Sequence, residues 1–163
     1  MTITQRAGVR IELPGWDTLH ICALVLDLNG TVATDGSLVP GVAERVRALL
    51  PHVDVFLLTA DTLGTAGAVA QELGCELLVL ETGREAEQKR DWVRQLGTDR
   101  VMAIGNGVND ALMLKEAVLG IAVIGQEGAA VPALLAADVV VPAITDALDL
   151  LLRPARLVAT LRR

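Results

Sequence analysis

The sequence predicts an α/β fold: a three-layer, doubly wound, mostly parallel sheet of the Rossmann-like kind, with helices on both faces. Short apolar runs alternate with amphipathic stretches along all 163 residues, which gives five to six strand–helix units. Hydrophobic residues make up 52% of the chain but aromatic residues only 2%, with no tyrosine, so the core must be aliphatic. Aliphatic runs are typical of parallel strands that are buried on both faces.

The first half of the chain contains the expected turns. We expect strands at 9–13, 19–26 and 53–58, a small hairpin at 32–39, and helices at 40–50 and from about 61 to 73. Pro14-Gly15 separates the first two strands, and Asp35-Gly36 is typical of a hairpin tip. Pro40 favours a helix start, because its missing N–H group needs no partner in the first turn.

The second half repeats the strand–helix alternation. We expect strands at 77–80, 101–104, 121–124 and 139–141, and helices at 83–96, 110–118, 129–136, 144–152 and 155–162. Thr82 and Glu85 have the spacing of a capping box before the helix that ends at Gly97. No linker or repeat divides the chain, so we expect one domain over 1–163.

Composition also limits the partners. The net charge of −6 and a pI near 4.8 argue against a nucleic-acid partner, because no basic stripe is present to neutralise phosphates. Cys22 and Cys75 indicate a reducing cytoplasm, and we expect both to be small core residues. We expect no secretory signal and no membrane partner, since Gln126, Glu127 and several glycines interrupt the weakly polar segment 117–137.

Polar residues follow three of the apolar runs. Asp27 follows the second predicted strand, Thr59 follows the strand at 53–58, and Asp110 closes the turn after the strand at 101–104. In a doubly wound sheet, the carboxyl ends of the strands share one crevice where ligands bind. We therefore expect these three side chains to converge in one pocket. Taken alone, an Asn-Gly pair after an apolar run is more typical of a simple turn.

The order of these motifs resembles the haloacid-dehalogenase-type phosphohydrolases and phosphotransferases. The matching motifs are Asp27-Leu28-Asn29-Gly30-Thr31, Leu58-Thr59-Ala60-Asp61, Lys89 and Gly105-Asn106-Gly107-Val108-Asn109-Asp110. The resemblance spans residues 19 to 141. The second and last motifs look most like the catalytic domain of P-type ATPases, without their transmembrane or nucleotide-binding segments. The chain thus resembles a soluble member of that type.

The resemblance implies a nucleophile and a cation. The family's carboxylate at the position of Asp27 attacks phosphorus and forms an aspartyl-phosphate, which requires that the repulsion between two anions be offset. Mg²⁺ held by Asp27, the backbone carbonyl of Asn29 and Asp110 would offset it, with Asn106 standing where the family usually has a metal-binding acid. Mg²⁺ suits such a small set of oxygen ligands. Asn109 would support this motif.

The resemblance also implies the groups that bind the phosphoryl oxygens. Thr59 would donate its hydroxyl, and Lys89 would supply a point charge. Backbone N–H groups of the Asn29-Gly30 turn and of Ala60 would hold the remaining oxygens, and Leu28 belongs to the same predicted phosphate site. The chain has only two lysines, and an ammonium can serve a phosphoryl group and a carboxylate together.

Several charged residues have simpler interpretations. By residue type alone, Lys89 is more typical of a solvated helix face, and the motif order reverses that interpretation. We interpret Lys115 as a surface residue and Asp61 as a helix cap rather than a catalyst. His20 and His52 occupy no motif position and are predicted to be structural or exposed.

Two amides replace acids that the family usually carries. The residue at the position of Asn29 normally protonates the leaving group and later activates water, and an amide can do neither. General acid–base catalysis contributes about 10²–10⁴ in rate, so slow turnover is expected. Asn106 removes one negative charge from the cation site, which should weaken Mg²⁺ binding.

The motif spacing leaves no room for a cap domain between Asp27 and Thr59 or between Thr59 and Lys89. The pocket should be open, so a large phosphorylated substrate or a neighbouring subunit of a homo-oligomer would have to cover it. The hairpin at 32–39 is the built-in candidate for partial closure.

Three functions therefore stay open. The preferred one is a slow Mg²⁺-dependent phosphohydrolase that works through Asp27. The second is a phosphotransfer or phosphate-sensing protein with little turnover, and the third is a catalytically idle binding module. The substrate and the use of ATP cannot be derived from these residues.

Overall fold

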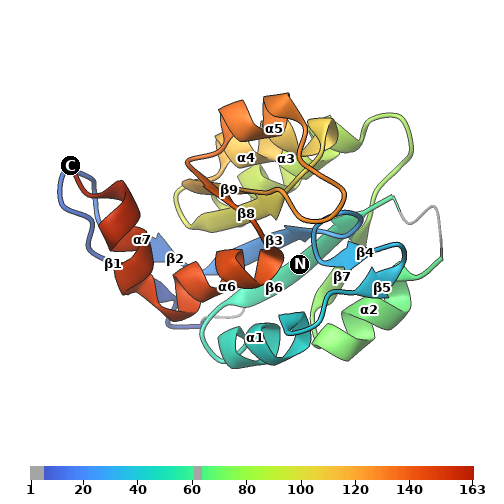
Figure 1. Ribbon diagram of the computed structural model, residues 1–163, viewed down its shortest axis with the longest axis horizontal. Coiled ribbons are helices and arrows are strands. Elements are labelled where there is room, and N and C mark those ends of the chain that lie inside the picture. Colours follow the sequence, from blue (N-terminus) through green and yellow to red (C-terminus); the bar gives the residue numbers. More distant parts are fainter. Residues whose placement is uncertain (1–5, 61–63) are drawn as a thin grey trace.

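The computed structural model describes residues 6–60 and 64–163, and its centre is a six-stranded parallel sheet (Figure 1). The strand order is β10-β9-β8-β3-β6-β7, and each neighbouring pair is parallel. The strands are β3 (Ala23–Asp27), β6 (Asp54–Thr59), β7 (Glu76–Val79), β8 (Val101–Gly105), β9 (Leu119–Val123) and β10 (Val139–Val141). This order confirms the predicted doubly wound α/β fold.

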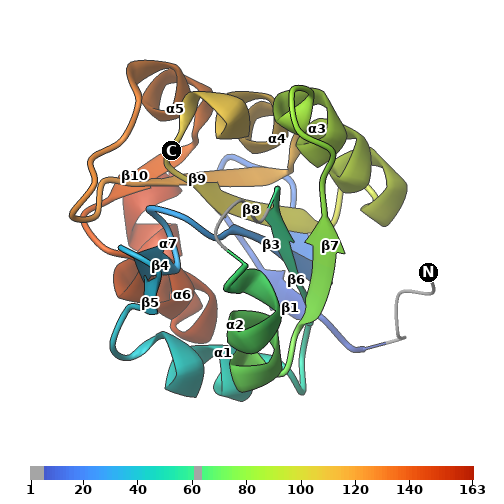
Figure 2. The ribbon, with the colours of Figure 1, turned by 90° about the vertical axis from the view of Figure 1, so that its right-hand side faces the viewer.

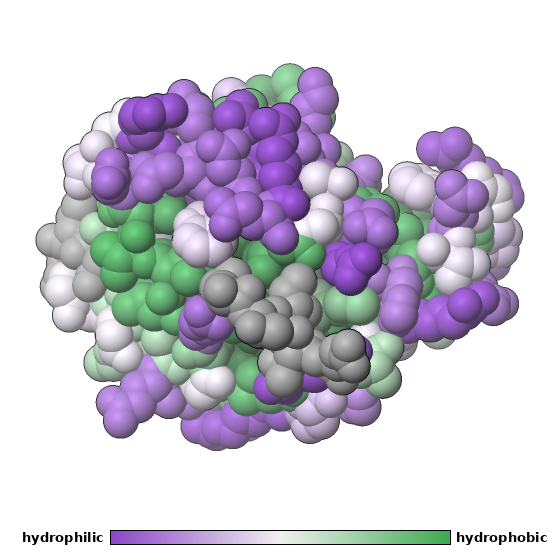
Figure 3. Space-filling model, turned by 180° about the vertical axis from the view of Figure 1, so that it is seen from behind, coloured by the Kyte–Doolittle hydropathy of each residue, from purple (hydrophilic) through white to green (hydrophobic). Residues whose placement is uncertain are grey.

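Helices cover both faces of the sheet (Figures 1 and 2). One face carries α1 (Val42–Leu49), α2 (Ala66–Leu73) and α6 (Ile144–Leu152), with α7 (Pro154–Leu161) beside α6. The other carries α3 (Glu85–Leu96), α4 (Ala111–Glu116) and α5 (Val131–Ala136). The outer side of α3 is strongly hydrophilic, as the upper part of Figure 3 shows. In the described residues, no helix has the length and apolarity that a membrane span requires.

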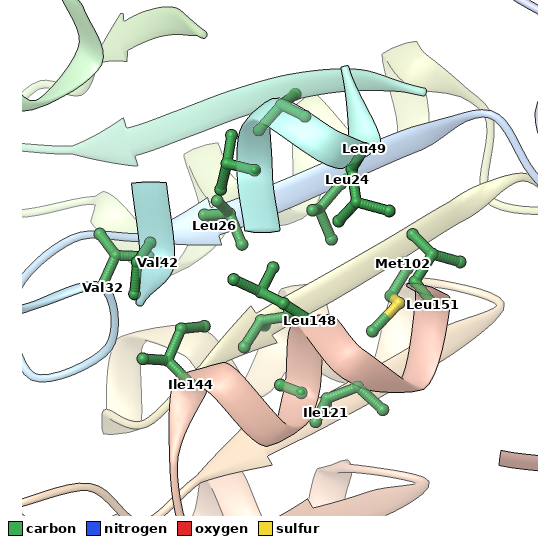
Figure 4. Close-up of a cluster of buried hydrophobic side chains, with 14 of the residues drawn as sticks. Leu24, Leu26, Val32, Val42, Leu49, Met102, Ile121, Ile144, Leu148 and Leu151 are labelled. Carbon is green, nitrogen blue, oxygen red and sulfur yellow. The ribbon is translucent and has the colours of Figure 1, made fainter. Parts of the chain in front are cut away.

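Each face of the sheet has its own aliphatic core, because side chains alternate along a strand. On β3, Leu24 and Leu26 pack with the α1, α2 and α6 side, where Leu49 and Leu148 close around them (Figure 4). Val25 belongs to the opposite core, under α3 to α5. All five residues of β3 are buried, which places the strand that carries Asp27 at the centre of the molecule.

The expected strand at 19–26 is divided in two. Leu19–Ile21 forms β2, which pairs antiparallel with β1 (Val9–Ile11), while β3 starts at Ala23. Between them, the Cys22 amide donates to the carbonyl of Arg100 (2.9 Å). The continuous hydrophobicity concealed this change of sheet. The prediction that Cys22 and Cys75 are core residues was wrong in degree, since both are half-buried.

Several predicted helix starts were too early: α2 begins at Ala66 rather than near 61 and α5 at Val131 rather than 129. Two further starts have a clear local cause. The first helix begins at Val42, because Gly41 is left-handed (φ 88°) and turns the chain after Pro40. The third begins at Glu85 with Arg84 at the capping position, and no side chain caps it, so Thr82 does not form the expected capping box. The predicted cap Asp61 lies outside the described residues.

The predicted small hairpin is present as β4 (Ala33–Thr34) and β5 (Ser37–Leu38). Asp35 and Gly36 form its tip with φ values of 51° and 80°, as expected of a type I′ turn. We call residues 33–38 the flap hairpin.

Gly120 and Gly67 should respond oppositely to alanine. A Cβ atom on Gly120 would overlap the backbone carbonyl of Leu114, whereas one on Gly67 in α2 would meet open space. We expect Gly120→Ala to lower the free energy of unfolding by about 1–3 kcal/mol and Gly67→Ala to raise it by about 0.5 kcal/mol. Urea unfolding of both variants tests this; equal effects would contradict the packing around Gly120.

Candidate active site

The topology brings the motif residues to one end of the sheet. β3 lies between β8 and β6, with Leu26 opposite Ile104 and Asp27 opposite Leu58. Thr59 follows Leu58 directly, so Asp27 lies between the end of β6 and the turn after β8. Figure 2 shows the molecule from this end, with the flap hairpin to one side.

A buried lysine joins two aspartates at this point. Lys89 reaches inward from α3, and its Nζ lies 2.8 Å from Asp27 Oδ1 and 2.6 Å from Asp110 Oδ1. The lysine side chain is only 2% exposed. Two carboxylates and one ammonium carry a net charge of −1 away from bulk water, which is costly unless the site binds a further cation or a proton.

The pKa values reflect this excess of negative charge. Burial, followed by repulsion from Asp110, raises the pKa of Asp27 to about 7, although Lys89 and Thr31 oppose the shift. The pKa of Lys89 is raised by attraction to Asp27 and Asp110, which outweighs the opposing effect of burial. Lys89 therefore stays charged, and Asp27 is the group whose proton is easily exchanged near neutral pH.

Both carboxylate oxygens of Asp110 accept hydrogen bonds from other groups of the protein. Its Oδ2 accepts the backbone N–H groups of Asn106 (2.9 Å) and Gly107 (2.8 Å), while its Oδ1 accepts from Lys89. It is fully buried. Gly105 makes room for it, since a Cβ atom there would lie 2.5 Å from the Asp110 carboxyl carbon. Asp110 thus holds Lys89 and shapes the turn after β8.

Thr31 connects Asp27 with Asn106. Its hydroxyl oxygen lies 3.1 Å from Asp27 Oδ2 and 3.3 Å from Asn106 Oδ1. The Asn106 side-chain nitrogen donates to the carbonyl of Gly128 (3.0 Å), which directs its oxygen toward Thr31 and Asp27. Two oxygen acceptors, Asp27 Oδ2 and Asn106 Oδ1, therefore face one buried hydroxyl.

A pocket of about 350 Å³ opens in front of these groups. We call it the Asp27 pocket, and it is lined by Asp27, Asn29, Thr59, Ala60, Glu85, Lys89, Asn106, Gly107 and Asn109. The predicted site residues in this lining are Asp27, Asn29, Thr59, Ala60, Lys89, Asn106 and Asn109. Leu28, Gly30 and Asp110 are not among them.

These three residues differ from the predicted roles for physical reasons. The Gly30 N–H donates to the carbonyl of Ala33 (2.8 Å) at the base of the flap hairpin, so it is not available to a phosphoryl oxygen. The Leu28 side chain packs into the core and its carbonyl accepts the N–H of Ala33 (3.0 Å), so neither of these groups faces the pocket. Both Asp110 oxygens are engaged, as described above, which leaves the predicted cation ligands Asp27, Asn29 and Asn106 at the pocket.

Two residues of the site were missed by the sequence reasoning. Thr31 stands four residues after Asp27, and its position in the first motif was the available signal. Glu85 lies one helical turn before Lys89 and was assigned only to a capping box. Backbone N–H groups of Gly83 and of Glu85 itself lower the pKa of its carboxyl, followed by a smaller contribution from Lys89. Glu85 therefore adds negative charge to the rim.

Three residues outside the motifs have the exposed positions that the sequence predicts. Lys115, His20 and His52 are exposed, which agrees with the predicted surface positions.

The donors at the Asp27 pocket fit a hard divalent cation. Asp27 Oδ2 and Asn106 Oδ1 both lie within hydrogen-bonding distance of the Thr31 hydroxyl, and Asn29 lines the same wall. Within residues 6–60 and 64–163, no three acids, histidines or cysteines form a metal cluster. Few protein oxygens, completed by water and phosphate oxygens, are typical of Mg²⁺ rather than of a fully protein-bound metal.

The fold is a three-layer α/β fold in which Asp27, at the end of the central strand β3, faces a polar pocket. The sequence model of the haloacid dehalogenase-like hydrolase family matches residues 10–117, more than half of the chain. The chain belongs to this family.

Similar proteins fall into two groups. An uncharacterized protein of Methanocaldococcus jannaschii is 59% identical over 63 residues, which cover 39% of this chain and 68% of that protein. A copper-transporting ATPase of Oryza sativa subsp. japonica is 32% identical over 109 residues, which cover 65% of this chain but only 11% of the transporter. The match to the transporter is therefore a match to a small part of it.

A solved structure has the same fold over most of both chains. It is the 3-deoxy-D-manno-octulosonate 8-phosphate phosphatase of Moraxella catarrhalis in complex with a magnesium ion, a phosphate ion and a KDO molecule. Its TM-score is 0.69 at 16% identity, and the alignment covers 86% of this chain and 92% of that one. The similarity establishes the fold.

Proposed function

We propose that this protein is a slow Mg²⁺-dependent phosphohydrolase that forms an aspartyl-phosphate on Asp27. The observation that carries the proposal is the contact of Lys89 with both Asp27 and Asp110 at the floor of a polar pocket. This arrangement brings a carboxylate and an ammonium group together at the end of the central strand, which supports a role of Asp27 as the nucleophile. Family membership and the phosphatase fold support the same chemistry.

The residues have distinct tasks in the first step. An Asp27 oxygen attacks phosphorus, the bond from phosphorus to the leaving oxygen breaks, and the leaving oxygen takes a proton from water. Lys89 and Thr59 face the phosphoryl oxygens and stabilise their charge. Asp27, the Asn29 carbonyl and Asn106 would hold Mg²⁺, which neutralises charge on the nucleophile and the phosphoryl group when bound. Asp110 positions Lys89.

The second step returns Asp27 to its resting state. Water attacks phosphorus, the bond between phosphorus and the Asp27 oxygen breaks, and phosphate leaves. Asn29 lines the pocket and is exposed at its mouth, where an acid would activate this water. An amide cannot accept the proton, so we expect this step to be slow.

Incubation with acetyl phosphate and Mg²⁺, followed by intact-mass and peptide mass spectrometry, tests the proposal. We expect phosphate release and an adduct of one phosphoryl group on Asp27, both absent in Asp27→Asn. Adduct formation without release would instead favour the phosphotransfer function, for which Asn29 is the supporting observation. Neither adduct nor release, with the protein folded, would overturn phosphoryl chemistry and leave a binding module.

Restoring the acid should speed dephosphorylation. We expect Asn29→Asp to hydrolyse the phospho-enzyme faster by up to about 10²–10⁴-fold, because the new carboxylate can activate water. The decay of adduct after removal of acetyl phosphate measures this rate. Asn109→Asp, an equivalent change at the exposed rim, serves as the control; equal acceleration in both variants would show a general charge effect instead.

The pocket also needs a cover during the reaction. Exposed Asn29 and Asn109 line it, so water reaches its mouth. We propose that a large phosphorylated substrate or a second copy of the chain covers this opening, since exclusion of water strengthens the electrostatic contacts inside.

A further inference from the structure

A second cavity, larger than the Asp27 pocket, lies beneath the flap hairpin. Its volume is about 590 Å³, within the range of about 300–1,000 Å³ that is typical of small-molecule sites. The flap hairpin and the residues after it form one wall, and the loop after β9 and the start of α6 form the others. We call it the flap cavity. Figure 2 shows β4 and β5 beside this end of the sheet.

The lining of the flap cavity is almost uncharged. Leu38, Val39 and Ile144 provide apolar surface, while Ser37 and Gln126 provide polar groups. Among the described residues of the lining, the one charged side chain is that of Asp35 at the hairpin tip. Such a lining matches an uncharged ligand, because a charged one would lose its hydration without gaining a partner.

A wall of one residue's thickness separates the two cavities. Gly30 and Thr31 line the flap cavity, and neither of them lines the Asp27 pocket. On its other side, the Thr31 hydroxyl contacts Asp27 and Asn106, which do line the Asp27 pocket. Asn106 is fixed in turn by Gly128. A molecule in the flap cavity would therefore press on the residue that orients Asp27.

We propose that the flap cavity binds an uncharged small organic molecule with an apolar face and hydroxyl groups, and that its occupancy is coupled to Asp27 through Thr31. This site is distinct from the phosphoryl site and goes beyond the proposed hydrolase activity. The coupling follows from contact, because Thr31 cannot move without changing the hydrogen bonds of Asp27 and Asn106.

Methyl NMR of the metal-free protein tests the proposal, with trans-cyclohexane-1,2-diol as the probe. We expect saturable shifts for the methyl groups of Leu38, Val39 and Ile144, accompanied by the Thr31 methyl group. Ala143→Phe fills the cavity from the start of α6 and should weaken binding more than about tenfold, or 1.4 kcal/mol. Ala155→Phe, the same change at an exposed position on α7, should leave binding unaltered.

Ser37→Phe is a second filling variant, at a solvent-accessible residue of the flap hairpin that lines the cavity, should Ala143→Phe not fold. Shifts that fail to saturate, or that are equal in wild type and a folded filling variant, would overturn the site. Saturable binding without movement of the Thr31 resonance would overturn the coupling. Because the measurement needs no turnover, its outcome is independent of whether Asp27 is phosphorylated.

Discussion

Replacing Lys89 by methionine should lower the free energy of unfolding by about 3–5 kcal/mol, because it leaves buried carboxylates without their partner. Asp27 and Asp110 would then face each other with both contacts to Nζ removed. Methionine keeps most of the aliphatic volume, so the loss reports the charge rather than a cavity. Urea unfolding at pH 7.5 in EDTA measures it.

The only other lysine supplies the control. Lys115 lies exposed on α4, and Lys115→Met should change the free energy of unfolding by no more than about 0.5 kcal/mol. Adding Asp110→Asn to Lys89→Met removes one of the two repelling carboxylates, so the double variant should recover part of the lost free energy of unfolding. A double-mutant cycle measures this coupling between positions 89 and 110. If Lys89→Met were as stable as Lys115→Met, the buried ion cluster would not exist in solution.

The order of strand ends made much of the site predictable. Asp27 and Thr59 could be placed together from sequence, because parallel strands all end at the same edge of the sheet. Helical periodicity places Lys89 on the buried face of α3, one turn before Val93 and two turns before Leu96. Its residue type favoured a solvated position instead, and the motif order was needed to reverse that interpretation.

The remaining differences concern hydrogen bonds that spacing cannot reveal. Asp110 was expected to bind a cation, but the tight turn after β8 points two backbone N–H groups at its Oδ2. The N–H of Gly30 closes the flap hairpin instead of facing the pocket. In both cases the motif predicts the residue correctly, and the local turn determines which of its atoms can contact a ligand.

Replacing Asp27, the proposed nucleophile, by asparagine should stabilise the metal-free protein, and more so at high pH. The pKa of Asp27 is about 7 in the folded protein against 3.8 ordinarily, so the folded state binds its proton more tightly than the unfolded state. The stabilisation of the folded state by this proton is fully present below pH 3.8 and is lost as the pH rises through about 7. The amide introduced by Asp27→Asn has no such proton to lose, so the variant avoids that loss of stability.

We expect the free energy of unfolding of Asp27→Asn to match that of the wild type near pH 4. At pH 8 it should exceed the wild-type value by on the order of 3 kcal/mol, which corresponds to about 6–12 °C in melting temperature. Thermal unfolding in EDTA across this pH range measures the difference, with Asp17→Asn at an exposed position as the control. A difference independent of pH, or a variant less stable at pH 8, would contradict the excess of buried negative charge. A gain in stability together with the loss of phosphorylation would show that Asp27 is maintained for chemistry at the expense of the fold.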